Sequence, residues 1–99
     1  MQDIEAAHRL IVGSIRRNRD IAAAGIDGET FLMSIERGRY YALDAAATAV
    51  WQRLDLEPTG EALIAGLIAD FQGDPVGIHG DVLALLHQWL EEGLVSIDA

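Results

Sequence analysis

An abrupt change from strand to helix in the middle of the chain constrains this fold more than any other sequence feature. Residues 39–43 read RYYAL, and their two adjacent tyrosines favour a strand. Asp44 follows at once, and the segment after it, AAATAVWQRL, has a high helix propensity. The Asp44 side chain can accept hydrogen bonds from the free amides of the first helical turn, and its charge complements the helix dipole. The pattern therefore predicts a strand that runs directly into a capped helix.

Two further strands are predicted before this one. Asp27-Gly28 separates the segment 20–26 from the segment 29–35, and this dipeptide supplies the positive φ angles of a tight two-residue turn. Period-2 alternation places Phe31, Met33 and Ile35 on one face of the second strand. A second turn around Gly38 leads into 39–43. We expect three short antiparallel strands.

Two more helices are predicted after the alanine-rich one. The second runs from about 60 to 71 and is capped by Thr59, and the third runs from about 75 to 92 and is capped by Asp74. Gly93 ends the third helix. The expected fold is therefore α+β and winged-helix-like, with a three-stranded antiparallel sheet followed by a three-helix bundle.

The two chain ends carry weaker signals. Residues 1–13 form a lead-in that could be a short helix or an extended arm, and the main domain is expected to span 14–97. The basic segment SIRRNR, residues 14–19, is interpreted as solvated, and LVSI, residues 94–97, as a short extended tail.

Charge and composition exclude several classes of protein. The chain has 99 residues and a net charge of −9, and its seven basic residues are all arginines between Arg9 and Arg53. A duplex-binding surface needs cations that neutralise phosphates, so we expect no nucleic-acid partner. The chain has no cysteine, no basic signal-peptide start and no apolar run of membrane-spanning length. These features predict a cytoplasmic protein without a membrane partner.

The residues that usually carry catalysis are missing or badly spaced. Three histidines, His8, His79 and His87, lack metal-ligand spacing, and the chain has no lysine, no Gly-rich phosphate loop and no G-x-S-x-G turn. We therefore predict no enzyme activity, no metal and no cofactor. A binding module is the remaining class.

Two features suggest where such a module could bind. The strand 39–43 is expected at a sheet edge, where an extended peptide can add a strand, and Tyr40 and Tyr41 point to its opposite faces. The third helix has an apolar arc wider than the ~100° of an ordinary surface helix. One flank of that arc could face a groove, or the helix could simply pack against two neighbours.

Three segments in order resemble a known family. They read GRYYALDAAATAVWQRL, PTGEALIAGLIADF and DVLALLHQWLEEGLV, and the pattern is similar to that of the PqqD-like family over roughly residues 14 to 97. Members are peptide chaperones, also called RiPP recognition elements, with three strands and three helices. The resemblance implies that a precursor's leader segment adds as a strand in the groove between the third strand and the third helix.

The resemblance also suggests which residues bind the peptide. Carried over by position, it implies that the residues on the strand side are Arg39, Tyr40, Tyr41 and Ala42. The helical wheel of the third helix supplies the candidates for the helix side, which are His79, Asp81, Leu83 and Leu86. Two features depart from the family pattern: PVGIHG places two glycines in the first turns of the third helix, and the first dozen residues have no clear counterpart.

The predicted function is non-catalytic recognition of a leader peptide, which is then presented to a maturation enzyme such as a leader peptidase, a cyclase or a radical-SAM enzyme. We favour a lasso-peptide pathway. One alternative is a chaperone of PQQ biosynthesis that serves a radical-SAM enzyme. Another is a winged-helix DNA-binding regulator, whose third helix would have to read DNA despite carrying Asp81, Glu91 and Glu92 and no arginine or lysine. A third is an enzyme subunit that only scaffolds a partner.

Overall fold

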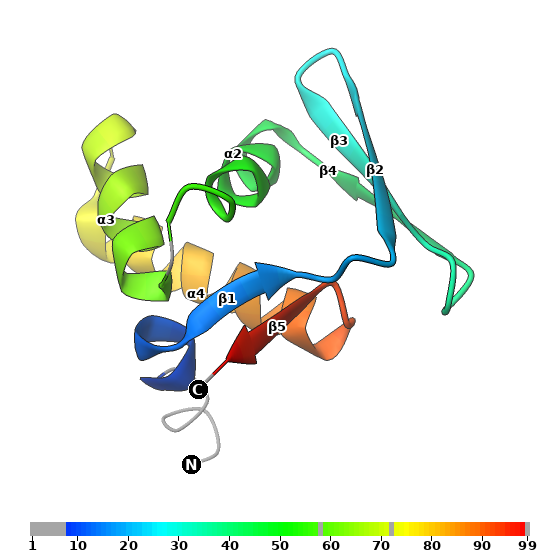
Figure 1. Cartoon of the computed structure of the whole chain (residues 1–99). Coiled ribbons are helices and arrows are strands. Elements are labelled where there is room, and N and C mark those ends of the chain that lie inside the picture. Colours follow the sequence, from blue (N-terminus) through cyan, green and yellow to red (C-terminus); the bar gives the residue numbers. More distant parts are fainter. Residues whose placement is uncertain (1–7, 58, 72, 99) are drawn as a thin grey trace.

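The computed structural model describes residues 8–57, 59–71 and 73–98, and it has the expected α+β architecture (Figure 1). Three antiparallel strands form one sheet in the order β2-β3-β4. Their bounds are β2 (Ile21–Ile26), β3 (Glu29–Ser34) and β4 (Arg39–Leu43). In Figure 1 this sheet lies to one side of the helices, and the β2–β3 hairpin projects from them. The three predicted strands are confirmed to within a residue at each end.

The turn between β2 and β3 has the geometry that its sequence predicts. Asp27 and Gly28 have φ angles of 53° and 81°, so both adopt the positive φ of a type I′ turn. The turn is closed by the pair Ile26–Glu29. A two-residue turn of this kind is flanked by a hydrogen-bonded pair, and such pairs alternate along antiparallel strands. The register of β2 against β3 therefore follows from this turn.

Each of the three long helices follows a residue whose side chain caps it. The helices are α2 (Ala45–Arg53), α3 (Gly60–Asp70) and α4 (Pro75–Glu91). The carboxylate of Asp44 accepts a hydrogen bond of 2.8 Å from the Ala47 amide, which satisfies one of the free donors of α2. Thr59 and Asp74 cap α3 and α4 in the same way, and Gly93, with a φ of 75°, follows the end of α4. Local capping thus sets where the chain changes direction.

Two segments near the chain ends pair with each other, which corrects our interpretation of residues 14–19 as solvated. Residues Ser14–Arg17 form β1 and pair antiparallel with Val95–Asp98, which form β5. The segment 14–19 is therefore not merely solvated, and most of the extended tail predicted at 94–97 belongs to a paired strand. The strands β1 and β5 form a two-stranded ribbon, and the side chains of Ile15 and Val95 are buried beneath it. A four-residue strand with one buried apolar residue carries too little periodicity to be recognised, and its partner lies at the other end of the chain.

The described part of the lead-in is helical and packs on the domain. Residues 8–12 are helical, and the Leu10 side chain is buried in the main core. Gly60, the first residue of α3, lies directly against this segment, because a Cβ built on Gly60 would overlap the Leu10 carbonyl. A glycine is therefore required at this crossing. The proposed boundary between 13 and 14 remains a prediction, and residues 1–7 lie outside the described residues.

The core joins the helices, the ribbon and one face of the sheet. Its buried apolar residues come from every element except β2 and include Leu32, Leu63 and Leu86. Trp51 of α2 and Trp89 of α4 meet edge to face, with ring centroids 5.4 Å apart and planes at 87°. This contact fixes how α2 and α4 are placed relative to one another.

An arginine of the ribbon secures the same helix. The Arg17 guanidinium lies 4.8 Å from the Trp51 ring centroid, donates hydrogen bonds to the Trp51 carbonyl and pairs with Asp55 at 3.0 Å. This carbonyl belongs to the last turn of α2, where it also accepts a hydrogen bond of 3.3 Å from the Leu54 amide. Within the basic segment 14–19, Arg17 therefore has a structural role.

The sheet packs on the core through one face only. Thr30, Leu32 and Ser34 of β3 are buried, whereas Phe31 and Ile35 are 41% and 72% exposed. The predicted common face of Phe31, Met33 and Ile35 is thus the open face of the sheet. Side chains on the buried face point toward α2, which directly follows β4.

Candidate functional site

The outer edge of β4 is unpaired among the described residues. Strand β3 pairs with one edge of β4, and no described segment pairs with the other. The pair Ile26–Glu29 closes the hairpin, so alternation points the backbone groups of Thr30, Leu32 and Ser34 toward β4. Their partners in β4 are Leu43, Tyr41 and Arg39. The backbone N–H and C=O groups of Tyr40 and Ala42 therefore point to the free edge and can accept an added strand.

An ionic cluster joins β4 to the end of α4. The Tyr41 hydroxyl donates a hydrogen bond of 2.8 Å to Oε2 of Glu92, and Arg39 approaches the same oxygen at 3.3 Å. Arg37 lies 3.9 Å from it. Partial burial of the Tyr41 side chain and its hydrogen bond to Glu92 raise the pKa of the phenol above 10.0. These contacts hold β4 beside the C-terminal end of α4.

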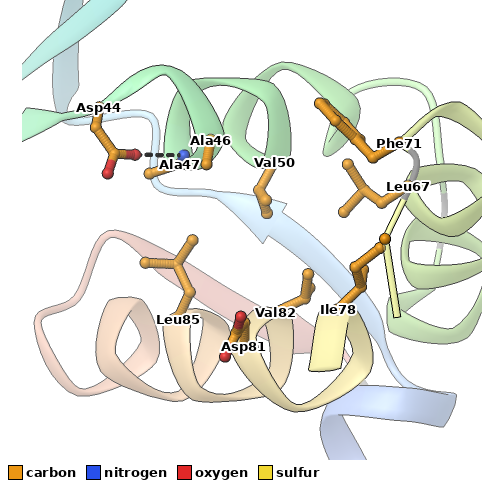
Figure 2. Close-up of a pocket in the computed structure, with 11 residues that line it drawn as sticks. Asp44, Ala46, Ala47, Val50, Leu67, Phe71, Ile78, Asp81, Val82 and Leu85 are labelled. Atoms are coloured by element: carbon orange, nitrogen blue, oxygen red, sulfur yellow. Dashed lines mark hydrogen bonds between the residues drawn. The ribbon is translucent and has the colours of Figure 1, made fainter. Parts of the chain in front are cut away.

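Beyond this cluster, α4 and the start of α2 enclose an apolar groove of about 390 Å³ (Figure 2). This volume lies within the range of roughly 300–1,000 Å³ that is usual for ligand sites. Figure 2 shows Asp44 and Val50 on one wall and Asp81, Val82 and Leu85 on the other. The remaining lining residues are Ala46, Ala47, Leu67, Phe71, Gly73 and Ile78. Strand β4 ends at Leu43, directly before Asp44, which lines the groove, so the strand and the groove adjoin.

The strand residues that the sequence suggested divide into two sets. Tyr40 and Ala42 are exposed on the open face, and Tyr40 is 80% exposed. Arg39 and Tyr41 lie on the other face, where both contact Glu92. The two tyrosines thus point to opposite faces, as the alternation predicts. All four residues share the free edge strand, but Arg39 and Tyr41 already have partners within the chain.

Of the helix residues that the sequence suggested, only Asp81 lines the groove. His79 is exposed outside it, and Leu83 packs against the core on the opposite flank of α4. Leu86 has no exposed surface at all, so its side chain cannot touch a peptide in this structure. The groove is instead lined by Ile78, Val82 and Leu85. That any of these residues binds a peptide remains a prediction.

The wide apolar arc of α4 was the signal for the residues that the sequence reasoning missed. Ile78, Val82 and Leu85 lie on one side of that arc, and His79 and Leu83 lie on the other. Both flanks are compatible with a groove when only the helix is considered. Which flank of α4 faces the groove depends on where α2 and α3 pack, because Val50 and Leu67 form the opposite walls.

The groove and the strand edge together offer a binding surface. Within residues 8–57, 59–71 and 73–98, no group of three or more histidine, aspartate or glutamate residues could hold a metal ion. In the same part of the chain, no helix has both the length and the apolar character needed to cross a bilayer. The groove combines an apolar floor with a neighbouring strand edge, which is an arrangement suited to an extended peptide.

The fold and the edge-strand groove define a class, namely small α+β domains of PqqD-like architecture. A family profile described as coenzyme PQQ synthesis protein D (PqqD) matches residues 29–95, and the chain belongs to this family. The match includes β3, β4 and all of α2, α3 and α4. It therefore contains the whole candidate site. No match was found among curated proteins.

Two solved structures share the fold. One is described as TbiB1 in complex with the TbiA(beta) leader peptide; it has a TM-score of 0.76 and 23% sequence identity, and the alignment covers 85% of this chain and 98% of that one. The other is a lasso peptide synthetase B1 complexed with the leader peptide, with a TM-score of 0.73, 22% identity, and coverage of 84% and 98%. Both structures agree with the α+β fold expected from the sequence.

Proposed function

We propose that this protein recognises the leader segment of a ribosomally synthesised precursor peptide and presents it to a maturation enzyme. The leader adds as a strand along the free edge of β4 and continues into the groove between α2 and α4. Backbone hydrogen bonds to Tyr40 and Ala42 hold the added strand, and the apolar groove selects its side chains. The protein itself carries out no chemistry on the peptide and acts in the cytoplasm.

One observation carries this proposal. The unpaired edge of β4 and the apolar groove adjoin each other at Asp44, so a single extended peptide can occupy both. Support comes from the two proteins of the same fold that are described as bound to leader peptides. The description of one of them as a lasso peptide synthetase B1 favours a lasso-peptide pathway, whereas the family description keeps PQQ biosynthesis as the second candidate.

Surface charge argues against the DNA-binding alternative. Helix α4 has no lysine or arginine, and its residues Asp81 and Glu91 are exposed. Phosphates would be repelled from this helix. We expect no salt-dependent binding of random duplex DNA.

The proposal is tested by titrating the protein with a synthetic leader peptide of the precursor encoded beside its gene. Nuclear magnetic resonance should show the largest shifts at the amides of Tyr40 and Ala42, and at the methyl groups of Val50 and Leu85. Hydrogen exchange at those two amides should slow in the complex, because they gain partners. Binding without any change at β4 would contradict the proposal, and so would the absence of binding.

A further inference from the structure

Two carboxylates stand at the mouth of an otherwise apolar groove. Among the described lining residues, Asp44 and Asp81 are the ionisable ones, and they belong to facing walls (Figure 2). Both side chains are exposed, so their charge is available to a ligand that enters the groove.

Neither carboxylate has a cationic partner within the described parts of the chain. The ion pairs of the arginines lie elsewhere: Arg16 with Asp98, Arg17 with Asp55, Arg37 and Arg39 with Glu92, and Arg53 with Glu57 and Asp70. The groove therefore keeps a local negative charge that nothing in these ranges neutralises.

The two carboxylates differ in how well the fold already stabilises them. One oxygen of Asp44 accepts a hydrogen bond from the Ala47 amide, and the positive end of the α2 dipole lies beside it. Asp81 lies beyond the first turn of α4 and has no such compensation. A ligand cation would therefore gain more from Asp81 than from Asp44.

A peptide in the groove would increase the effect of these charges. The apolar walls formed by Val50, Val82 and Leu85 exclude water once the groove is filled, and electrostatic interactions strengthen where water is excluded. An acidic residue placed there would be repelled by both walls. A lysine or arginine would be attracted by both.

We infer that this groove selects a peptide segment in which a large apolar side chain is closely followed or preceded by a lysine or arginine, with Asp81 as the specificity-determining residue and Asp44 in a supporting role. The inference rests on the proposed function, because it assigns the chemistry of the peptide that the same site binds. It goes further by naming the positive charge that the peptide must carry and the residue, Asp81, that recognises this charge.

A randomised peptide library displayed on phage tests this preference and does not require the leader to be identified. The wild-type protein should enrich sequences that carry a lysine or arginine close to a large apolar residue. Asp81→Asn should lose the enrichment of basic residues and retain that of apolar residues. Glu91→Gln removes the same charge from an exposed site on the same helix, outside the groove, and should behave as wild type.

A binding measurement with an enriched peptide makes the test quantitative. Replacing its basic residue by arginine or by citrulline compares a charged side chain with an uncharged one of nearly the same shape. Citrulline should weaken binding to the wild-type protein about three- to tenfold and should have almost no effect on Asp81→Asn. Asp44→Asn keeps a capping side chain and should give a smaller effect.

The outcomes separate this inference from the proposed function. If no peptide is enriched by the folded wild-type protein, the proposed function itself fails. If peptides are enriched without a preference for basic residues, only the present inference is overturned. The same holds if Asp81→Asn and Glu91→Gln reduce the preference equally, because the net charge of the protein would then be sufficient.

Discussion

The phenol of Tyr41 on β4 donates a hydrogen bond of 2.8 Å to the carboxylate of Glu92 at the end of α4. This contact joins the edge strand to the helix that forms one wall of the groove. It also means that one of the two adjacent tyrosines has a structural partner, while Tyr40 remains exposed on the open face. The two adjacent tyrosines of the segment RYY thus lie in different environments.

The environment of Tyr41 should raise the pH at which its phenol ionises. In a Tyr40→Phe background Tyr41 is the one remaining tyrosine, and we expect its phenolate absorbance to appear with a midpoint above pH 10.0. The additional change Glu92→Gln should lower this midpoint, because the hydrogen bond to a carboxylate and its negative charge both favour the protonated phenol. An unchanged or higher midpoint in Glu92→Gln would contradict this assignment.

The same shift predicts how stability depends on pH. The pKa of Tyr41 is higher in the folded chain than in the unfolded one, so the folded state binds more protons in the interval between the two values. The contribution of Tyr41 is therefore complete below pH 10 and is lost as the pH rises through the raised pKa. Chemical denaturation across this range should show a steeper loss for the parent than for Tyr41→Phe.

Proline substitutions should distinguish the two edges of the sheet. Ala42→Pro removes an N–H that points to the free edge of β4, and it should weaken binding of a leader peptide about three- to tenfold. Ala23→Pro is the matched control, because Ala23 is exposed and its N–H points to the outer edge of β2. Calorimetric titration should show wild-type affinity for Ala23→Pro, provided that circular dichroism confirms that both variants fold. Equal losses in the two variants would contradict strand addition at β4.

Two glycines that are both helical should respond oppositely to alanine. Gly60→Ala places a methyl group against the Leu10 backbone and should destabilise the protein by about 1–3 kcal/mol. Gly80→Ala in α4 meets no atom within 4 Å and should stabilise it by about 0.5–1 kcal/mol, because alanine favours the helix. Urea denaturation measures both changes. A stable Gly60→Ala protein would show that the helical segment 8–12 does not pack on α3.

Two neighbouring arginines should contribute unequally to stability. Arg17→Ala removes a cation–π contact, hydrogen bonds to the Trp51 carbonyl and an ion pair, and should cost about 1–3 kcal/mol. Arg16 is the control, since its side chain is 69% exposed and pairs with the exposed Asp98. Arg16→Ala should change the free energy of unfolding by less than about 0.5 kcal/mol. Similar losses for both would indicate that charge alone matters in this ribbon.

Local signals were enough to predict most elements and the edge strand. Asp27-Gly28 set the hairpin, Asp44 set the strand-to-helix change, and Gly93 set the end of α4, because each acts on its own immediate backbone. The family resemblance then placed the candidate site between β4 and α4. The alternation of Tyr40 and Tyr41 likewise needed no distant contact, since it follows from the pleat of a single strand.

The location of the groove could be determined only from the tertiary structure. The apolar residues of its α4 wall are Ile78, Val82 and Leu85, whereas His79 and Leu83 lie outside it, and this choice depends on where α2 and α3 pack against that helix. The pairing of β1 with β5 was undetermined for a similar reason, because it joins residues at opposite ends of the chain. The sequence by itself determined the bounds of β2, β3 and β4 and of the three long helices to within a residue or so, through interactions within a few residues. Only the folded chain decided which faces meet, because burial of a side chain depends on neighbours that are distant in the sequence.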